Sequence, residues 1–288
     1  NDDPVVGRVG LASILGRLRQ NFDVQKGQLG LNNPRNEQTR FSLRSEAFRI
    51  LPPGTNDSAN ANWRALLQAG AVTNLWEVPE FRRYCRPFAP ESAGPQPGLV
   101  LRFGTTVTAG RNFFGQPLGP LDSSYDPSEF STRIRSLAVW MSDYDTAGLT
   151  ARPRVYLVPV GADQLRASDD SFDVRSWQVV EQRIPVPYPL TDTALALADW
   201  NPQADSLDGS FSDLRRHSAF RAYLDATWDV NQFSESSRLV GRSVWNTQWV
   251  LIVPGAYLLG DPAEGLNRFI DSVSDIKLYF QTYSASGH

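Results

Sequence analysis

The sequence predicts a mainly β protein: a two-sheet antiparallel sandwich of jelly-roll type, with long loops and a few short helices, preceded by an N-terminal helical stem. Past residue 40, short segments with period-two alternation recur, and turn-rich segments separate them. Near the start, apolar residues at helical spacing predict the stem. We expect the helical stem in residues 1–35 and the β-sandwich domain in residues 36–288.

The composition is that of a folded domain held together by burial. Hydrophobic residues make up 41% of the chain, and 8 Trp, 9 Tyr and 15 Phe supply aromatic surface. The formal net charge of −3 predicts no broad surface for nucleic acid. No run of the sequence approaches the ~18 apolar residues that a membrane span needs. Cys85 is the single cysteine, so an internal disulfide is excluded.

The start of the chain predicts a larger parent protein. Residue 1 is Asn1 and the single methionine is Met141, so we expect a processed product or the C-terminal part of something longer. The 28 basic residues include two lysines, Lys26 and Lys277. This bias is typical of a GC-rich genome, and the alternative is selection of guanidinium groups for contacts with carboxylates or interfaces.

The predicted stem helix covers residues 5–29. Arg17, Arg19 and Gln20 lie on its polar side. Gly30 follows the helix, and the segment Asn32-Asn33-Pro34 then prevents it from continuing. The apolar side carries Val9, Leu11, Ile14, Leu15, Leu18 and Phe22.

The clearest strands lie late in the chain. Further strands are expected at 41–50, 99–107, 134–141, 154–160 and 177–184. The expected apolar face of residues 244–253 carries Trp245, Thr247, Trp249, Leu251 and Val253, and that of residues 276–283 carries Ile276, Leu278 and Phe280. Trp245 and Trp249 share their face with aliphatic residues, which favours core packing over exposed rings.

Three helices are expected among the strands, at residues 63–69, at residues 212–225 and from Asp261-Pro262 to about Ile270. Ser212 and Asp261 are typical helix caps, and proline is favoured in the first turn. Residues 52–61, 89–98 and 185–210 are expected to be long loops. Prolines at 185, 187 and 189 exclude a central strand there and indicate an extended edge or a surface strap.

Common catalytic arrangements are not supported. A serine hydrolase would have to use His217 or His288 as its base, and no G-x-S-x-G motif occurs. Cys85 has no histidine nearby in sequence, and phosphate-binding loops are absent. A carboxylate pair for glycosidic chemistry is a spatial feature that stays open, since 31 acidic residues are available. We therefore expect no enzyme, no catalytic residue and no cofactor.

Two acidic loop segments could bind a structural calcium ion. One contains Asp143 and Asp145, and the other contains Asp169, Asp170 and Asp173. Both offer oxygen ligands at alternating spacing, but neither has the spacing or the terminal glutamate of a helix-loop-helix calcium site. Solvated turn carboxylates are the alternative interpretation.

Four aromatic residues are candidates for exposed rings that contact a ligand or a partner. Tyr279 and Tyr283 lie on the polar face of the last strand, and Trp200 and Trp228 lie in expected loops. Flat exposed rings are what glycan-binding sandwiches use to stack sugars. These residues therefore keep a carbohydrate-binding function open.

Two segments resemble a known family. Residues 63–81 read WRALLQAGAVTNLWEVPEF, and residues 130–140 read FSTRIRSLAVW. Together they resemble the C-terminal region of the A component of bacterial insecticidal toxin complexes. In that region a helical shaft enters a β-sandwich through a leucine-pair helix, a Pro-Glu turn and an R-I-x-S-V-type strand.

The resemblance covers about a sixth of the chain. Residues 82–129 are an insertion between its two segments, and the tail looks like the close of uncharacterised domains of very large bacterial proteins. The resemblance implies a non-enzymatic sandwich that docks onto a companion subunit. No residue-level binding site is carried over.

The sequence therefore predicts a non-enzymatic interaction or assembly domain at the C-terminus of a large, secreted or extracellular bacterial protein. It would dock to a partner subunit or to a copy of itself. The alternative is a lectin-like carbohydrate-binding sandwich, and the third reading is an enzyme with an unseen carboxylate pair.

Overall fold

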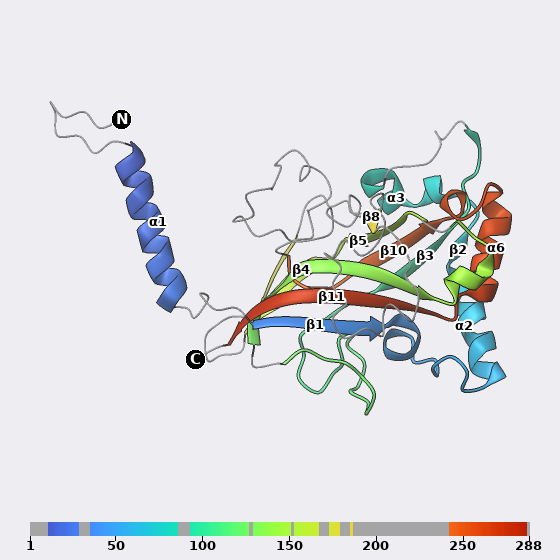
Figure 1. Cartoon of the computed structure of the whole chain (residues 1–288), viewed down its shortest axis with the longest axis horizontal. Helices are drawn as coiled ribbons and strands as arrows, with labels where there is room; N and C mark the ends of the chain where they lie inside the picture. The colour runs from blue at the N-terminus through green and yellow to red at the C-terminus, as the bar shows by residue number, and fades with distance from the viewer. Residues whose placement is uncertain are drawn as a thin grey trace.

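A computed structural model describes residues 11–28, 35–85, 93–126, 129–150, 153–166, 173–178, 185–186 and 242–286. The described chain is mostly β, with antiparallel sheets and a few short helices (Figure 1). The predicted mainly β class is therefore confirmed. The jelly-roll connectivity stays a prediction, and the helix expected at residues 212–225 lies outside the described residues.

The first sheet joins segments that are far apart in the sequence. Its antiparallel strands, in the order β1-β11-β4, are β1 (Arg35–Ser42), β11 (Asp275–Ser286) and β4 (Glu129–Ser142). The strands expected at 276–283 and 134–141 are confirmed, and both are longer than expected. The predicted inward face is also confirmed, because Ile276, Leu278 and Phe280 are buried in the core.

The second sheet is built around β10. Its order is β2-β3-β10-β5-β8, comprising β2 (Ala71–Val72), β3 (Gly98–Phe103), β10 (Trp249–Pro254), β5 (Val155–Pro159) and β8 (Pro185–Val186). All six residues of β10 are buried. β8 lies at the edge of this sheet, as the proline pattern predicts.

The main hydrophobic core lies between these two sheets, which gives the fold its sandwich-like layers. Leu278 and Leu137 contribute from the first sheet, and Leu251 and Leu157 contribute from the second. The loop after β3 also reaches this core, because Phe113 stacks on Phe41 with ring centroids 3.8 Å apart. The predicted insertion is thus part of the fold.

A smaller core covers the outer face of the second sheet. Val250 and Ile252 of β10 point into it. They meet Leu75 of η2 (Leu75–Glu77) and Phe81 of α3 (Pro79–Tyr84). Figure 1 shows α3 beside this sheet, near β10 and β5.

A third, small sheet has the order β7-β6-β9, with β7 (Val174–Gln178), β6 (Ala162–Arg166) and β9 (Trp245–Asn246). The chain leaves it at Asn246 and enters the second sheet at Trp249. The single strand expected at 244–253 is therefore wrong, and Thr247 is exposed instead of facing the core. Trp245 and Trp249 are 2% and 1% exposed, which confirms their core assignment.

The buried Asn246 side chain explains this break. Its Oδ1 accepts hydrogen bonds from the Gly161 and Gln248 backbone N–H groups, both at 3.0 Å. Its Nδ2 donates to Asp163 Oδ1 at 2.7 Å and to the Gly161 carbonyl at 3.3 Å. Asp163 also forms a buried ion pair with Arg242 at 2.9 Å. A side chain that satisfies backbone groups in this way replaces the ladder of a continuous strand.

One of the expected helices begins earlier in the chain than predicted. α2 (Asp57–Gly70) begins inside the expected loop at 52–61, because Asn56 Oδ1 caps it by accepting from Ala59 N at 2.7 Å. α6 (Pro262–Ser272) has the expected Asp261 cap and first-turn proline. α1 (Leu11–Gln28) lies within the expected stem helix at residues 5–29. The remaining short helical turns are η4 (Tyr144–Ala147) and η7 (Gly255–Tyr257).

Three strand limits also differ. The strand expected at 41–50 ends at Ser42, where the π-helical turn η1 (Leu43–Ala47) begins. The strand expected at 99–107 ends at Phe103, and the one expected at 154–160 is confirmed as β5. The strand expected at 177–184 overlaps β7, which begins earlier, at Val174, and ends at Gln178. Residues 179–184 lie outside the described residues.

We expect Asn246→Ala to lower the free energy of unfolding by about 2–3 kcal/mol, because it leaves buried N–H and carbonyl groups without partners. Urea unfolding would measure this loss. Asn62→Ala, the same change at an exposed position of α2, should alter stability by less than about 0.5 kcal/mol. Equal effects of the two variants would contradict the assigned role of Asn246.

Candidate functional site

Buried charged side chains gather around the turn η1. Its π-type closure is shown by the Phe48 N–H donating to the Leu43 carbonyl at 2.9 Å. Arg44, Glu46 and Asp275 are 0%, 6% and 2% exposed. Single π turns are rare and often occur at functional sites. The candidate site is therefore η1 together with the side chains that contact it.

Arg44 joins three separate segments through its guanidinium group. Nε donates to the Leu51 carbonyl at 2.7 Å, and Nη1 donates to the Ser274 carbonyl at 2.7 Å. Nη2 donates to Asn60 Oδ1 on α2 at 2.8 Å. The planar guanidinium group thus connects η1 to α2 and to the residue just before β11. A lysine ammonium group cannot direct its hydrogen bonds in this fixed planar arrangement.

Asp275 holds the other side of the turn. Its two carboxylate oxygens accept from the Ser42 hydroxyl at 3.0 and 2.9 Å, and Oδ1 accepts from the Arg44 backbone N–H at 3.3 Å. Burial raises the pKa of Asp275 to about 6, although the hydrogen bond from Ser42 opposes this shift.

Glu46 connects η1 to the loop that follows β3. Oε1 accepts from the Ser42 N–H and Oε2 accepts from the Ser123 N–H, both at 2.8 Å. Burial raises the pKa of Glu46 to about 7, which outweighs the opposing effect of these two backbone hydrogen bonds. A carboxylate with both oxygens bonded to backbone groups holds the loop in place.

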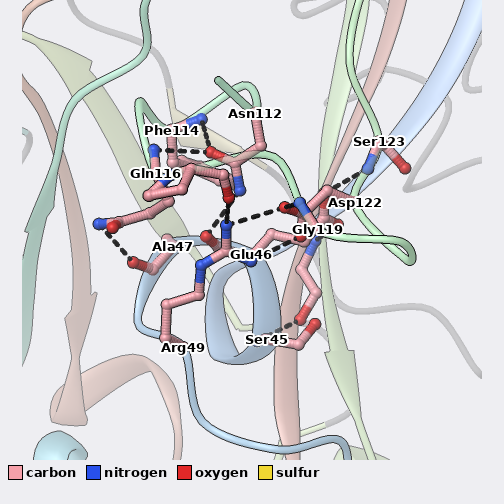
Figure 2. Close-up of polar contacts among 12 residues, drawn as sticks. Ser45, Glu46, Ala47, Arg49, Asn112, Phe114, Gln116, Gly119, Asp122 and Ser123 are labelled. Carbon is pink, nitrogen blue, oxygen red and sulfur yellow. Dashed lines mark hydrogen bonds and ion pairs between the residues drawn. The ribbon is translucent and has the colours of Figure 1, made fainter. Parts of the chain in front are cut away.

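Residues 110–123, which we call the anchored loop, are fixed to η1 at further points (Figure 2). Asn112 Nδ2 donates to the Glu46 carbonyl at 2.9 Å. Arg49 forms a two-point ion pair with Asp122, at 2.7 and 2.8 Å, and also donates to the Pro117 carbonyl. The backbone of Arg49 is in the left-handed region, with φ of 56°. The anchored loop thus presents Leu118 and Leu121, 51% and 85% exposed, from a fixed backbone.

A polar cleft of about 200 Å³ lies beside this network. Asn60 and Arg64 of α2 and Asp271 of α6 line it, together with Arg44 and Asp143. The mixture of guanidinium, carboxylate and amide groups suits a small polar molecule. Trp63 also lines the cleft, but the ring is 1% exposed and its Nε1 donates to the Val273 carbonyl at 2.8 Å. It offers no open face on which a sugar could stack.

An exposed apolar stripe lies along the helix α1. It consists of Ile14, Leu15, Leu18 and Phe22, which are 45%, 55%, 59% and 63% exposed. Every α1 side chain whose burial is described, at positions 14–22, 24 and 25, is exposed. Figure 1 shows α1 standing away from the sheets.

The four predicted exposed aromatics have different outcomes. Tyr279 is 4% exposed, so the expectation of an open ring is wrong there, and burial raises its pKa to about 12. The error has a physical reason: alternation identifies the face of β11 that carries the ring, whereas its exposure depends on distant segments, and Arg40 of β1 is its cross-strand neighbour. Tyr283 is half-buried. Trp200 and Trp228 lie outside the described residues.

Of the reactive groups considered from the sequence, Cys85 lies within the described residues. Cys85 is 5% exposed within the core under α3, where a substrate has no access. His217 and His288 lie outside the described residues. Within the described ranges, no helix is long and apolar enough to cross a membrane.

The acidic segments do not form a metal site in the described part of the chain. No three His, Cys, Asp or Glu side chains come together there to hold an ion. Asp143 Oδ2 instead accepts from the Ser274 hydroxyl. Asp169 and Asp170 lie outside the described residues, so the calcium hypothesis is untested for that segment.

Sequence reasoning missed Arg44, Glu46 and Asp275. One local signal was available: the Ser42 hydroxyl accepts from Ser45 N at 3.0 Å, while Glu46 accepts from Ser42 N. This reciprocal pattern resembles a capping box and favours a helical turn over a strand. The pairing with Asp275 has no such local signal.

The chain matches no protein-family model and no curated protein.

The free energy of unfolding should fall as the pH rises from about 5 to 8. In the folded state the pKa of Glu46 is about 7 against an ordinary 4.5, and the pKa of Asp275 is about 6 against 3.8. Between these values the folded state therefore holds protons that the unfolded state has released. This contribution to the free energy of unfolding is fully present at a pH below the ordinary pKa values. It is lost as the pH rises through the pKa values of the folded state. We expect a fall on the order of 1–3 kcal/mol by urea unfolding.

Glu46→Gln cannot ionise and should remove much of this pH dependence. Glu77→Gln, at an exposed position, is the matched control and should keep it. A Glu46→Gln protein with the full pH dependence would refute the assignment.

Proposed function

We propose that this chain is a non-enzymatic interaction domain that docks to a protein partner through α1. The exposed apolar stripe of α1 carries this proposal. Most helices in proteins gain their stability by packing an apolar face and not from the helix propensity of their residues, and we expect the same of the 18 residues of α1. The α1 side chains whose burial is described are all exposed, so no described part of the chain covers the stripe and its apolar surface is available to a partner.

The rest of the described structure suits a docking platform. Arg44 and Glu46 fix η1 and the anchored loop by side-chain hydrogen bonds, and Arg49 adds an ion pair to Asp122. Leu118 and Leu121 are therefore held in place before any partner binds. A preorganised contact loses less conformational entropy on association than a mobile one.

The buried carboxylates are assigned to this structural role. Glu46 and Asp275 are 6% and 2% exposed, and each accepts backbone N–H bonds. A substrate would have to displace these bonds to reach either group. The polar cleft, whose one lining ring is buried, does not favour a carbohydrate site.

The proposal includes a distant relation to the A components of insecticidal toxin complexes, and with it a secreted or extracellular bacterial protein that forms an assembly. Its support is the order of elements in the two segments that resemble that family. The helix α2, carrying Leu66 and Leu67, leads into the Pro79-Glu80 start of α3, and residues 130–140 lie in β4.

Native mass tests the proposal. Light scattering on material isolated from its source without denaturation should give a mass well above that of its own polypeptide measured after denaturation, of which these 288 residues contribute 32.1 kDa. The variant Leu15→Glu with Leu18→Glu should reduce this to a single-chain mass, because charged groups cannot be buried in an apolar contact. Cooperative melting should be unchanged, since the stripe packs against nothing described.

The matched control is Arg17→Glu with Gln20→Glu, which changes the polar side of α1. It should keep the large mass. A native mass equal to that of one unaltered polypeptide, or an assembly that the stripe variant leaves intact, would refute docking through α1.

A further inference from the structure

Three residues of the α1 stripe, together with Leu11, follow the spacing of a coiled-coil seam. Leu11, Leu15, Leu18 and Phe22 are separated by four, three and four residues, which is the alternation of a and d positions in a heptad. Gln25 occupies the next seam position. This spacing fits a helix laid alongside α1, and it is poorly suited to a flat sheet surface.

Basic residues follow one edge of this seam. Arg19 and Lys26 are seven residues apart, so both occupy the e position next to the stripe. On the other edge, the g positions carry Ile14 and Asn21, which have no charge. The acidic residue of the helix, Asp23, is at a b position away from the contact. The edge of the stripe is therefore positive, without a carboxylate in α1 to balance it.

A second copy of α1 does not complement this edge. In a parallel pair, e positions face g positions, so Arg19 would meet Ile14 and Lys26 would meet Asn21. In an antiparallel pair, e positions face each other, and Arg19 would meet Lys26 of the other copy. The first arrangement leaves the charges unpaired, and the second places like charges together.

From this arrangement we infer that the partner of α1 is an amphipathic helix with apolar a and d positions and acidic residues beside them. The inference rests on the docking function proposed above and specifies the partner's chemistry. Carboxylates beside the partner's seam would meet Arg19 and Lys26 as the apolar side chains interdigitate. Such flanking pairs set partner choice in coiled coils, whereas the seam supplies most of the affinity.

Two synthetic heptad peptides test this inference on the full 288-residue chain. Both carry leucine at a and d, and they differ in having glutamate or lysine at e and g. Fluorescence anisotropy would measure their dissociation constants. We expect the acidic peptide to bind about tenfold more tightly at low salt, with the ratio falling as salt screens the flanking charges.

Three variants assign the binding to named residues. Leu15→Glu with Leu18→Glu should abolish binding of the acidic peptide. Arg19→Glu with Lys26→Glu should reverse the preference, so that the basic peptide binds more tightly. Arg17→Glu, a charge reversal at a c position away from the seam, should change the preference for the acidic peptide by less than about twofold.

Equal affinity for the two peptides, tighter binding of the basic one, or no binding of either would overturn the acidic-helix inference. Docking itself would still stand if native material forms an assembly that the stripe variant dissolves. If the purified chain forms that assembly by itself, the occupant is a second copy. A single-chain native mass together with no peptide binding would reject both proposals.

Discussion

Strand β10 is apolar on both faces, and both must be removed from water. Leu251 and Val253 face the first sheet, while Val250 and Ile252 face η2 and α3. A strand of this kind cannot lie at the surface of a two-layer protein, because one of its faces would stay hydrated. The layers follow from this constraint: the β1-β11-β4 sheet covers one side, and the short helices between β2 and β3 cover the other.

The network of polar contacts holds together segments that this apolar layering leaves unconnected. Asn246 ends the small sheet and lets the chain enter β10, and Arg44 ties η1 to α2 and β11. Arg44 and Arg49 each bond to two or more acceptors through one planar group. At such positions the arginine-rich composition has a physical use, because an ammonium group cannot match two acceptors with the same fixed geometry.

Local sequence patterns predicted the elements that carry such a pattern in their own residues. The alternation in β11 and the Asp261-Pro262 start of α6 are sequence patterns with a direct mechanical cause, and both elements form as expected. The turn at Ser42 and the break at Asn246 differ, because their partners Asp275 and Asp163 are far away in sequence. Tyr279 shows the same limit: alternation identifies its face of the strand, but its exposure depends on what packs there. Among the features of the candidate sites, the α1 stripe could be found from spacing, whereas the η1 network could not.

The position of β11 within its sheet also constrains the order in which the protein can be made. β1 and β4 pair with β11 and not with each other, and they leave the ribosome long before residues 275–286 do. On a nascent chain these two strands therefore have no sheet to join until β11 emerges. Closing such distant segments is slow compared with local pairing. Until then this half of the sandwich stays unpaired, and a chain that ends before β11 cannot build it.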